Sequence, residues 1–185
     1  MSARWLIWVR ETLTVSGLYI AAFWLTSLVW MPIQNLFFAE FVHFASLLYL
    51  PFGVYVLTAW LLGWRSALAI LPGVIYAFWV LGGMNILLPS RIISIVIVIC
   101  VAPAVFHLLA LIGLDIRPKA GKQSCWICLM TAGILISVIK SVLVNNVLGS
   151  TPSEYVAYMI GDVSGLFFLM LALMLFFRSM RSAGH

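Results

Sequence analysis

Two ionisable residues, Lys140 and Asp162, lie inside long apolar segments of the chain. A charged side chain at membrane depth is costly, and it usually faces the interior of a helix bundle or a water-filled cavity. From the helical rise of about 1.5 Å per residue, we place both at one depth, roughly 10 Å below the outer membrane surface. The pair predicts a binding site for a polar or charged ligand. The alternative is a structural ion pair that fixes two helices against each other.

Other polar residues gather on the same predicted side of the membrane. One helical stripe of small and polar residues also has the composition that suits packing between helices in lipid. Its members are Gly133, Ser137, Lys140, Ser141 and Asn145. The expected ligand-binding residues are Lys140, Asp162, Asn85, Asn145, His43 and Glu40. The alternative for Glu40, His43 and the asparagines is that they are solvated helix ends.

Glycine and proline residues are expected to shape the packing of the helices. Gly161 and Gly165 form a G-x-x-x-G motif around Asp162, and small residues one turn apart let a neighbouring helix approach closely. Prolines fall inside predicted helices, where each removes a backbone hydrogen bond and is expected to kink its helix. These prolines are Pro51, Pro72 and Pro103. The expected helix-packing residues are Gly161, Gly165, Pro51, Gly53, Pro72 and Gly73.

Cys125 and Cys128 have the C-x-x-C spacing that soluble redox proteins use for a reversible disulfide. A zinc site would have only Cys125, Cys128 and His107 as ligands, which is too few for a structural site. We expect His107 to be a buried histidine that bonds to a backbone carbonyl. We therefore expect no metal, no cofactor and no enzymatic activity. The alternative is a thiol-redox membrane enzyme that uses Cys125 and Cys128.

The composition is that of a membrane protein. Hydrophobic residues make up 65% of the 185 residues and charged residues 8%, and the formal net charge is +5. A soluble domain carries about 45–50% apolar and about 25% charged residues. A soluble enzyme, a disordered chain and a coiled coil are therefore excluded, and the scattered cations form no nucleic-acid-binding stripe. The predicted fold class is all-α, a polytopic membrane helical bundle in a single domain over residues 1–185.

Six apolar segments are each long enough to cross about 30 Å of hydrocarbon as a helix. They lie near residues 12–33, 41–62, 67–88, 92–114, 125–148 and 155–177. Six crossings place most of the ten Lys and Arg residues on one side: Arg4, Arg10, Arg65, Arg117, Lys119, Lys122, Arg178 and Arg181. Because loops rich in Lys and Arg stay in the cytoplasm, both termini are expected there, in the inner membrane of a bacterium.

Four short motifs carry a resemblance to a known family: Leu50-Pro51-Phe52-Gly53, Leu62-Gly63-Trp64-Arg65, Leu71-Pro72-Gly73 and Gly161-Asp162-Val163-Ser164-Gly165-Leu166. Together these parts of the chain resemble the MASE-type integral-membrane sensor domain of bacterial signalling proteins. The resemblance implies a sensor-like or small-ligand-binding module that acts in signal transduction through a cytoplasmic or membrane partner protein. The six-helix arrangement is also similar to the substrate-binding subunits of vitamin transporters, so a transport component is the alternative. The expected partners are the lipid bilayer, an unknown small ligand in the outer half and a partner protein, with no nucleic acid.

Overall fold

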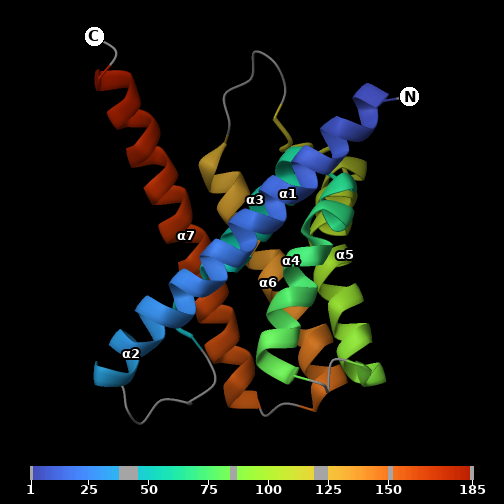
Figure 1. Ribbon diagram of the computed structural model, residues 1–185, viewed down its shortest axis with the longest axis vertical. Coiled ribbons are helices and arrows are strands. Elements are labelled where there is room, and N and C mark those ends of the chain that lie inside the picture. The colour runs from blue at the N-terminus through green and yellow to red at the C-terminus, as the bar shows by residue number, and fades with distance from the viewer. Residues whose placement is uncertain (1, 38–45, 84–86, 119–124, 150–151, 184–185) are drawn as a thin grey trace.

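The computed structural model describes residues 2–37, 46–83, 87–118, 125–149 and 152–183, and the regular secondary structure of these residues is helical (Figure 1). The elements are α1 (Ser2–Leu25), η1 (Thr26–Trp30), α2 (Met31–Phe37), α3 (Leu50–Leu62), α4 (Arg65–Gly82), α5 (Pro89–Leu111), α6 (Trp126–Leu148) and α7 (Pro152–Ala183). Leu25 and Met31 at the two joins keep right-handed helical dihedrals, so α1, η1 and α2 form one continuous helix with a π turn. The described residues thus form six helices, and five of them are long and apolar enough to cross a membrane.

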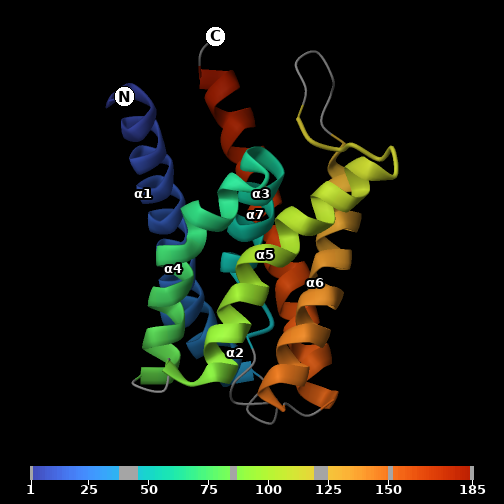
Figure 2. The same cartoon turned by 90° about the vertical axis from the view of Figure 1, so that its right-hand side faces the viewer.

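The helices run lengthwise through one bundle (Figures 1 and 2). Both ends of the chain lie at the same end of the bundle, together with the last turn of α5 and the first turn of α6. In the interior, α1 packs on α4 and α3, α5 packs on α4 and α6, and α7 packs on α6 and α3. Helix α3 is therefore surrounded by other helices, and its residues from Pro51 to Val56 are all buried.

The predicted helix at 41–62 is wrong over residues 46–49. Residues 41–45 lie outside the described part of the chain, and the segment 46–49 is not helical. Helix α3 has 13 residues, which span only about 20 Å at the helical rise and fall short of the membrane thickness. Irregular backbone is tolerated at membrane depth only where it is buried in protein or lines a cavity.

Two side chains and one backbone carbonyl of other helices accept hydrogen bonds from the backbone N–H groups of residues 47–50. The Leu47 N–H donates to Gln34 Oε1 at 2.8 Å, and the Leu50 N–H donates to Thr26 Oγ1 at 3.3 Å. The Tyr49 N–H donates to the Gly161 carbonyl of α7 at 2.8 Å. These partners replace the hydrogen bonds that a helix would have made, so the segment can leave the helical conformation without burying free donors.

Glycines of α7 allow the segment 46–49 to approach closely. A Cβ built on Gly161 would collide with the Ser46 carbonyl oxygen, and one on Gly165 would collide with the Tyr49 carbonyl oxygen. The backbone that approaches the G-x-x-x-G motif is therefore the irregular segment 46–49, whereas the sequence predicted a helix. Gly53 and Gly73 face neighbouring helices instead, since a Cβ there would lie 2.8 Å from Leu169 Cδ2 and 3.1 Å from Tyr19 Cδ1.

The prolines differ in their positions. Pro51 was expected to kink a helix, but it lies in the first turn of α3. Backbone N–H groups in the first turn make no hydrogen bond within the helix, so proline is tolerated there without a kink. Pro72 and Pro103 lie inside α4 and α5, as the sequence predicted. Helix α5 changes direction along its length (Figure 2), which is the effect expected of an internal proline.

Candidate ligand-binding site

Lys140 of α6 and Asp162 of α7 form a buried ion pair. Lys140 Nζ lies 2.5 Å from Asp162 Oδ2, and their side chains are 14% and 3% exposed. Ser137 Oγ donates to the same carboxylate oxygen at 3.1 Å. The Lys140 ammonium also lies 4.7 Å from the centre of the Phe52 ring, at a distance where an aromatic face attracts a cation. The sequence predicted contact between Lys140 and Asp162 from their equal depths, and the structure confirms this contact.

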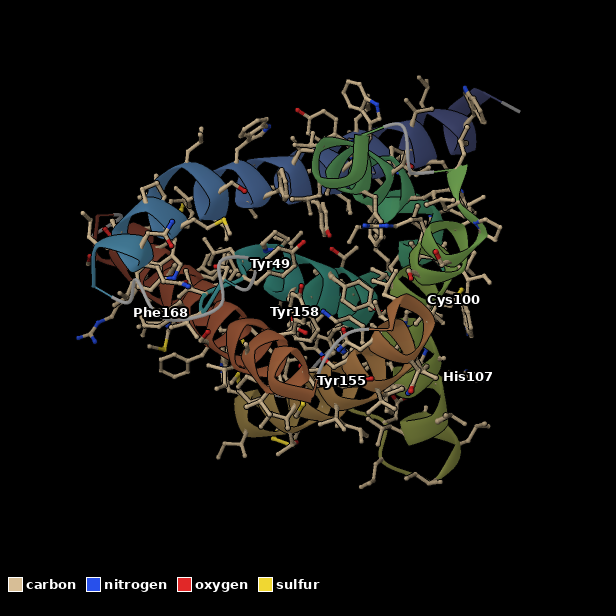
Figure 3. The ribbon with its side chains drawn as sticks, turned by 90° about the horizontal axis from the view of Figure 1, so that it is seen from below. Tyr49, Cys100, His107, Tyr155, Tyr158 and Phe168 are labelled. Carbon is tan, nitrogen blue, oxygen red and sulfur yellow. A yellow bond between two sulfur atoms is a disulfide. The ribbon has the colours of Figure 1, made fainter. Side chains whose placement is uncertain are left out.

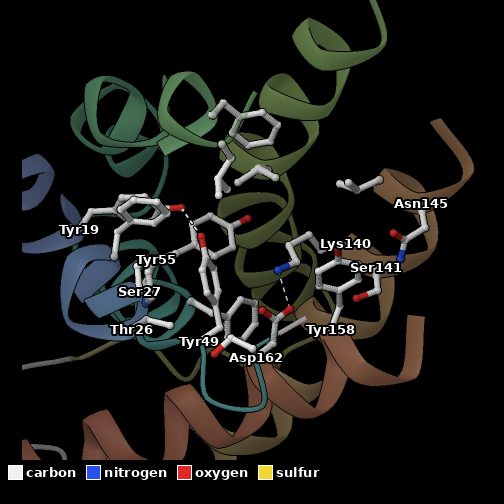
Figure 4. Close-up of a pocket in the computed structure, with 18 of the residues that line it drawn as sticks. Tyr19, Thr26, Ser27, Tyr49, Tyr55, Lys140, Ser141, Asn145, Tyr158 and Asp162 are labelled. Carbon is white, nitrogen blue, oxygen red and sulfur yellow. Dashed lines mark hydrogen bonds and ion pairs between the residues drawn. The ribbon is translucent and has the colours of Figure 1, made fainter. Parts of the chain in front are cut away.

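A cavity of about 250 Å³ lies beside this ion pair (Figure 4). Residues from every helix of the bundle line it, and aromatic or aliphatic side chains such as Phe23, Phe78 and Val98 supply much of the wall. Polar atoms reach it from α6, where Ser141 and Asn145 are both buried. Ser141 Oγ makes no hydrogen bond within the described part of the protein, which is an uncommon state for a buried hydroxyl.

Tyrosine side chains from separate elements meet at the cavity. The hydroxyls of Tyr19 and Tyr49 lie 3.3 Å apart, which links α1 to the segment before α3 (Figure 4). The Ala102 N–H of α5 donates to the Tyr55 hydroxyl at 2.5 Å, next to the internal Pro103 of that helix. Seen along the bundle, Tyr49 and Tyr158 lie between the helices (Figure 3). The hydroxyls therefore add polar groups to a mainly apolar interior.

The π turn η1 brings two further hydroxyl residues to the cavity. Thr26 and Ser27 both line it, and Thr26 Oγ1 also accepts the Leu50 N–H. A π turn inserts extra backbone into a helix and rotates the residues that follow it. The turn therefore orients the end of this helix both toward the cavity and toward the irregular segment before α3.

The structure places the predicted site residues in two groups. Lys140, Asp162 and Asn145 line the cavity together. Glu40, His43 and Asn85 lie outside the described residues. The cavity also contains residues that the sequence did not indicate as ligand-binding: Tyr19, Tyr49, Tyr158, Ser141 and Arg91. Of these, Ser141 belongs to the polar stripe of α6, and Arg91 is the loop cation on the same predicted outer side as the other polar residues.

Cys125 and Cys128 form a disulfide at the start of α6. Cys125 is the residue before the helix, and its sulfur accepts the Cys128 N–H at 3.1 Å. His107 was expected to be buried and is instead exposed, with its ring edge-on to Trp64 at 6.4 Å (Figure 3). In the described residues, no three His, Cys, Asp or Glu side chains are grouped so that they could hold a metal ion.

Over the described residues, fold and site define a helical protein with apolar helices that could cross a membrane and a buried ion pair beside a cavity lined by all six helices. No protein-family model, curated protein or solved structure matches this chain.

Proposed function

We propose that this chain is an integral membrane protein that binds a small ligand in its cavity and acts through a partner protein, as a sensor-like module. The observation that carries the proposal is that the Lys140–Asp162 ion pair borders a cavity into which all six helices contribute residues. A ligand that contacts every helix can change the balance between two arrangements of the bundle if it binds one of them better.

Two features favour a binding site over a purely structural ion pair. A structural ion pair needs only close packing and saturated hydrogen bonds around it. Here the ion pair adjoins unfilled space, and the neighbouring Ser141 hydroxyl has no partner among the described groups.

The proposal is tested by native mass spectrometry of protein solubilised in mild detergent. Val144 lines the cavity, whereas Val142 on the same helix is 45% exposed on the outer surface of the bundle. We expect the unaltered protein and Val142→Trp to carry a bound small molecule, and Val144→Trp to lose it because the larger side chain fills the cavity. A protein without an adduct, or an adduct that Val144→Trp retains, contradicts the proposal.

We further propose that the chain crosses the bacterial inner membrane with both termini in the cytoplasm. The support is the excess of Lys and Arg at the end of the bundle where both termini lie. The cavity then lies in the outer half, since Met31, Leu81 and Leu148 line it and belong to helix ends at the opposite end of the bundle.

The orientation predicts which engineered cysteines an impermeant thiol reagent reaches in intact cells. Leu87 and Leu114 are both exposed and lie at opposite ends of α5. In a background with Cys100, Cys125 and Cys128 replaced by serine, Leu87→Cys is expected to react in intact cells. Leu114→Cys is expected to react only after permeabilisation. Reaction of Leu114→Cys in intact cells means that the orientation is reversed.

The disulfide supports a second candidate function, thiol–disulfide exchange. Cys125 is exposed, and the two following residues, Trp126 and Ile127, are 47% and 77% exposed, so a partner protein can reach the disulfide. The cysteine-free background also separates the two functions. If the cysteine-free protein keeps its ligand and its effect on the partner, the thiols are not required. If the ligand and the effect on the partner are both lost, the redox function is favoured.

A further inference from the structure

Two hydroxyl protons at the cavity have no acceptor in the described part of the structure. The nearby Asp162 Oδ2 already accepts from Lys140 and Ser137. In the Tyr19–Tyr49 pair one hydroxyl donates to the other, so the second proton still needs an acceptor. The buried Ser141 hydroxyl adds a donor that has no described partner. A bound group that is rich in acceptors would satisfy these donors.

The charge of the cavity lining is positive. Among the described residues that line it, Lys140 and Arg91 are cations and Asp162 is the anion, which leaves a formal charge of +2 − 1 = +1. Arg91 is partly buried, and its guanidinium lies beside the end of α4, 3.8 Å from a Cβ built on Gly82. No described carboxylate forms an ion pair with it. A cation that is partly removed from water is stabilised by an opposite charge.

Helix α3 adds to this positive potential. Its first turn begins inside the bundle, and Tyr49, Pro51 and Phe52 of this region line the cavity. The N-terminus of a helix carries about half a positive charge. Interrupted helices in membrane transporters use such N-termini to bind anionic groups of a substrate.

The remaining wall limits the size and polarity of the ligand. Phe23, Phe52 and Phe78 give the cavity an aromatic lining. Its volume of about 250 Å³ is just below the range of about 300–1,000 Å³ that is usual for ligand pockets. A molecule with one ring or a short branched chain fits such a volume, whereas a two-chain lipid does not.

We propose that the ligand is a small organic monoanion, a carboxylate joined to one aromatic or branched apolar group. The carboxylate binds among Arg91, Lys140 and the Ser141 hydroxyl, and the apolar group packs on the phenylalanine rings. The Lys140–Asp162 pair stays intact, with Lys140 shared between Asp162 and the ligand. This inference rests on the proposed ligand-binding function and adds the chemical class of the ligand to it.

The test compares probes of one size and three charges by thermal unfolding in detergent. Benzoate is expected to raise the melting temperature with increasing concentration, because a ligand that binds only the folded state stabilises it. Benzyl alcohol and benzylamine are expected to leave it unchanged. Arg91→Gln is expected to weaken benzoate binding by about tenfold or more, as for loss of a hydrogen bond to a charged group. Arg178→Gln, an exposed position near the C-terminal end of α7, is the control and is expected to have no effect.

Several outcomes would overturn the inference, and they differ from failure of the proposed function. Stabilisation by benzylamine or benzyl alcohol, but not by benzoate, contradicts the anionic class while ligand binding itself stands. The inference also fails if none of benzoate, phenylacetate and 4-methylpentanoate stabilises the protein. Benzoate binding that survives Arg91→Gln or Val144→Trp means that benzoate binds outside this cavity. The proposed function fails only through the adduct experiment described above.

Discussion

Lys140→Met and Asp162→Asn are each expected to lower the free energy of unfolding in detergent by about 3–5 kcal/mol. Either substitution leaves one buried charge without its partner, because the two side chains are 14% and 3% exposed and lie 2.5 Å apart. The double variant Lys140→Met/Asp162→Asn removes both charges and is expected to recover most of the loss. Chemical denaturation followed by circular dichroism measures all four proteins of this cycle.

A second ion pair provides a control for the cycle. Arg65 of α4 and Glu11 of α1 also form an ion pair, with 2.7 Å between Arg65 Nη2 and Glu11 Oε2, but their side chains are 42% and 25% exposed. Ion pairs that water reaches contribute about 0–1 kcal/mol, so the cycle of Glu11→Gln and Arg65→Met is expected to show weak coupling. If the losses at Lys140 and Asp162 simply add, the two residues are not coupled and the ion pair is wrong.

The double variant also separates a binding site from a structural ion pair. If Lys140→Met/Asp162→Asn is stable and has lost the bound molecule, the pair belongs to the ligand site. If it is stable and keeps the bound molecule, the pair only holds α6 against α7, and the proposed role of Lys140 fails. Stability and ligand retention are therefore both measured on the same sample.

Hydropathy and residue depth were sufficient to predict much of this fold. Helices α4, α5, α6 and α7 fall on apolar segments that the sequence marks clearly. The contact between Lys140 and Asp162 followed from counting helical rises in two segments joined by a short loop. Both arguments use local properties of the chain, namely the length of an apolar segment and the distance of a residue from its end.

The irregular segment 46–49 could not be predicted in this way. Its residues are mostly apolar, so the sequence there resembles the helix that follows it. The conformation depends on backbone N–H groups that donate to Gln34, Thr26 and Gly161, which are distant in sequence. A hydropathy argument contains no information about which side chains are free to accept a backbone N–H.

The tyrosines of the cavity were missed for a related reason. Tyr19 lies on α1 and Tyr49 lies on the irregular segment, and their hydroxyls meet only in the folded bundle. Neither residue is on the same helix as Lys140, so no helical spacing in the sequence connects them to it. The π turn at Thr26–Trp30 also shifts the face that the end of its helix presents, so a regular 3.6-residue repeat gives the wrong orientation there.

Substitution of the glycines under the segment 46–49 is expected to have the other large effect on stability. In Gly161→Ala and Gly165→Ala the new methyl group would collide with backbone oxygens of Ser46 and Tyr49. Overpacking typically lowers the free energy of unfolding by about 1–3 kcal/mol. Because backbone atoms cannot rotate away from the new methyl group, we expect losses at or above the upper part of that range. Thermal unfolding in detergent measures the loss.

Gly17→Ala is the matched control for both variants, because Gly17 is also inside a helix but a Cβ there meets nothing within 4 Å. It is expected to leave stability unchanged or to raise it by up to about 1 kcal/mol, since alanine favours the helix. The same collision displaces Tyr49 from the cavity, so Gly165→Ala is also expected to retain less ligand than Gly17→Ala. If Gly165→Ala matches Gly17→Ala in stability, the irregular segment 46–49 does not lie against α7, and Tyr49 does not form this wall of the cavity.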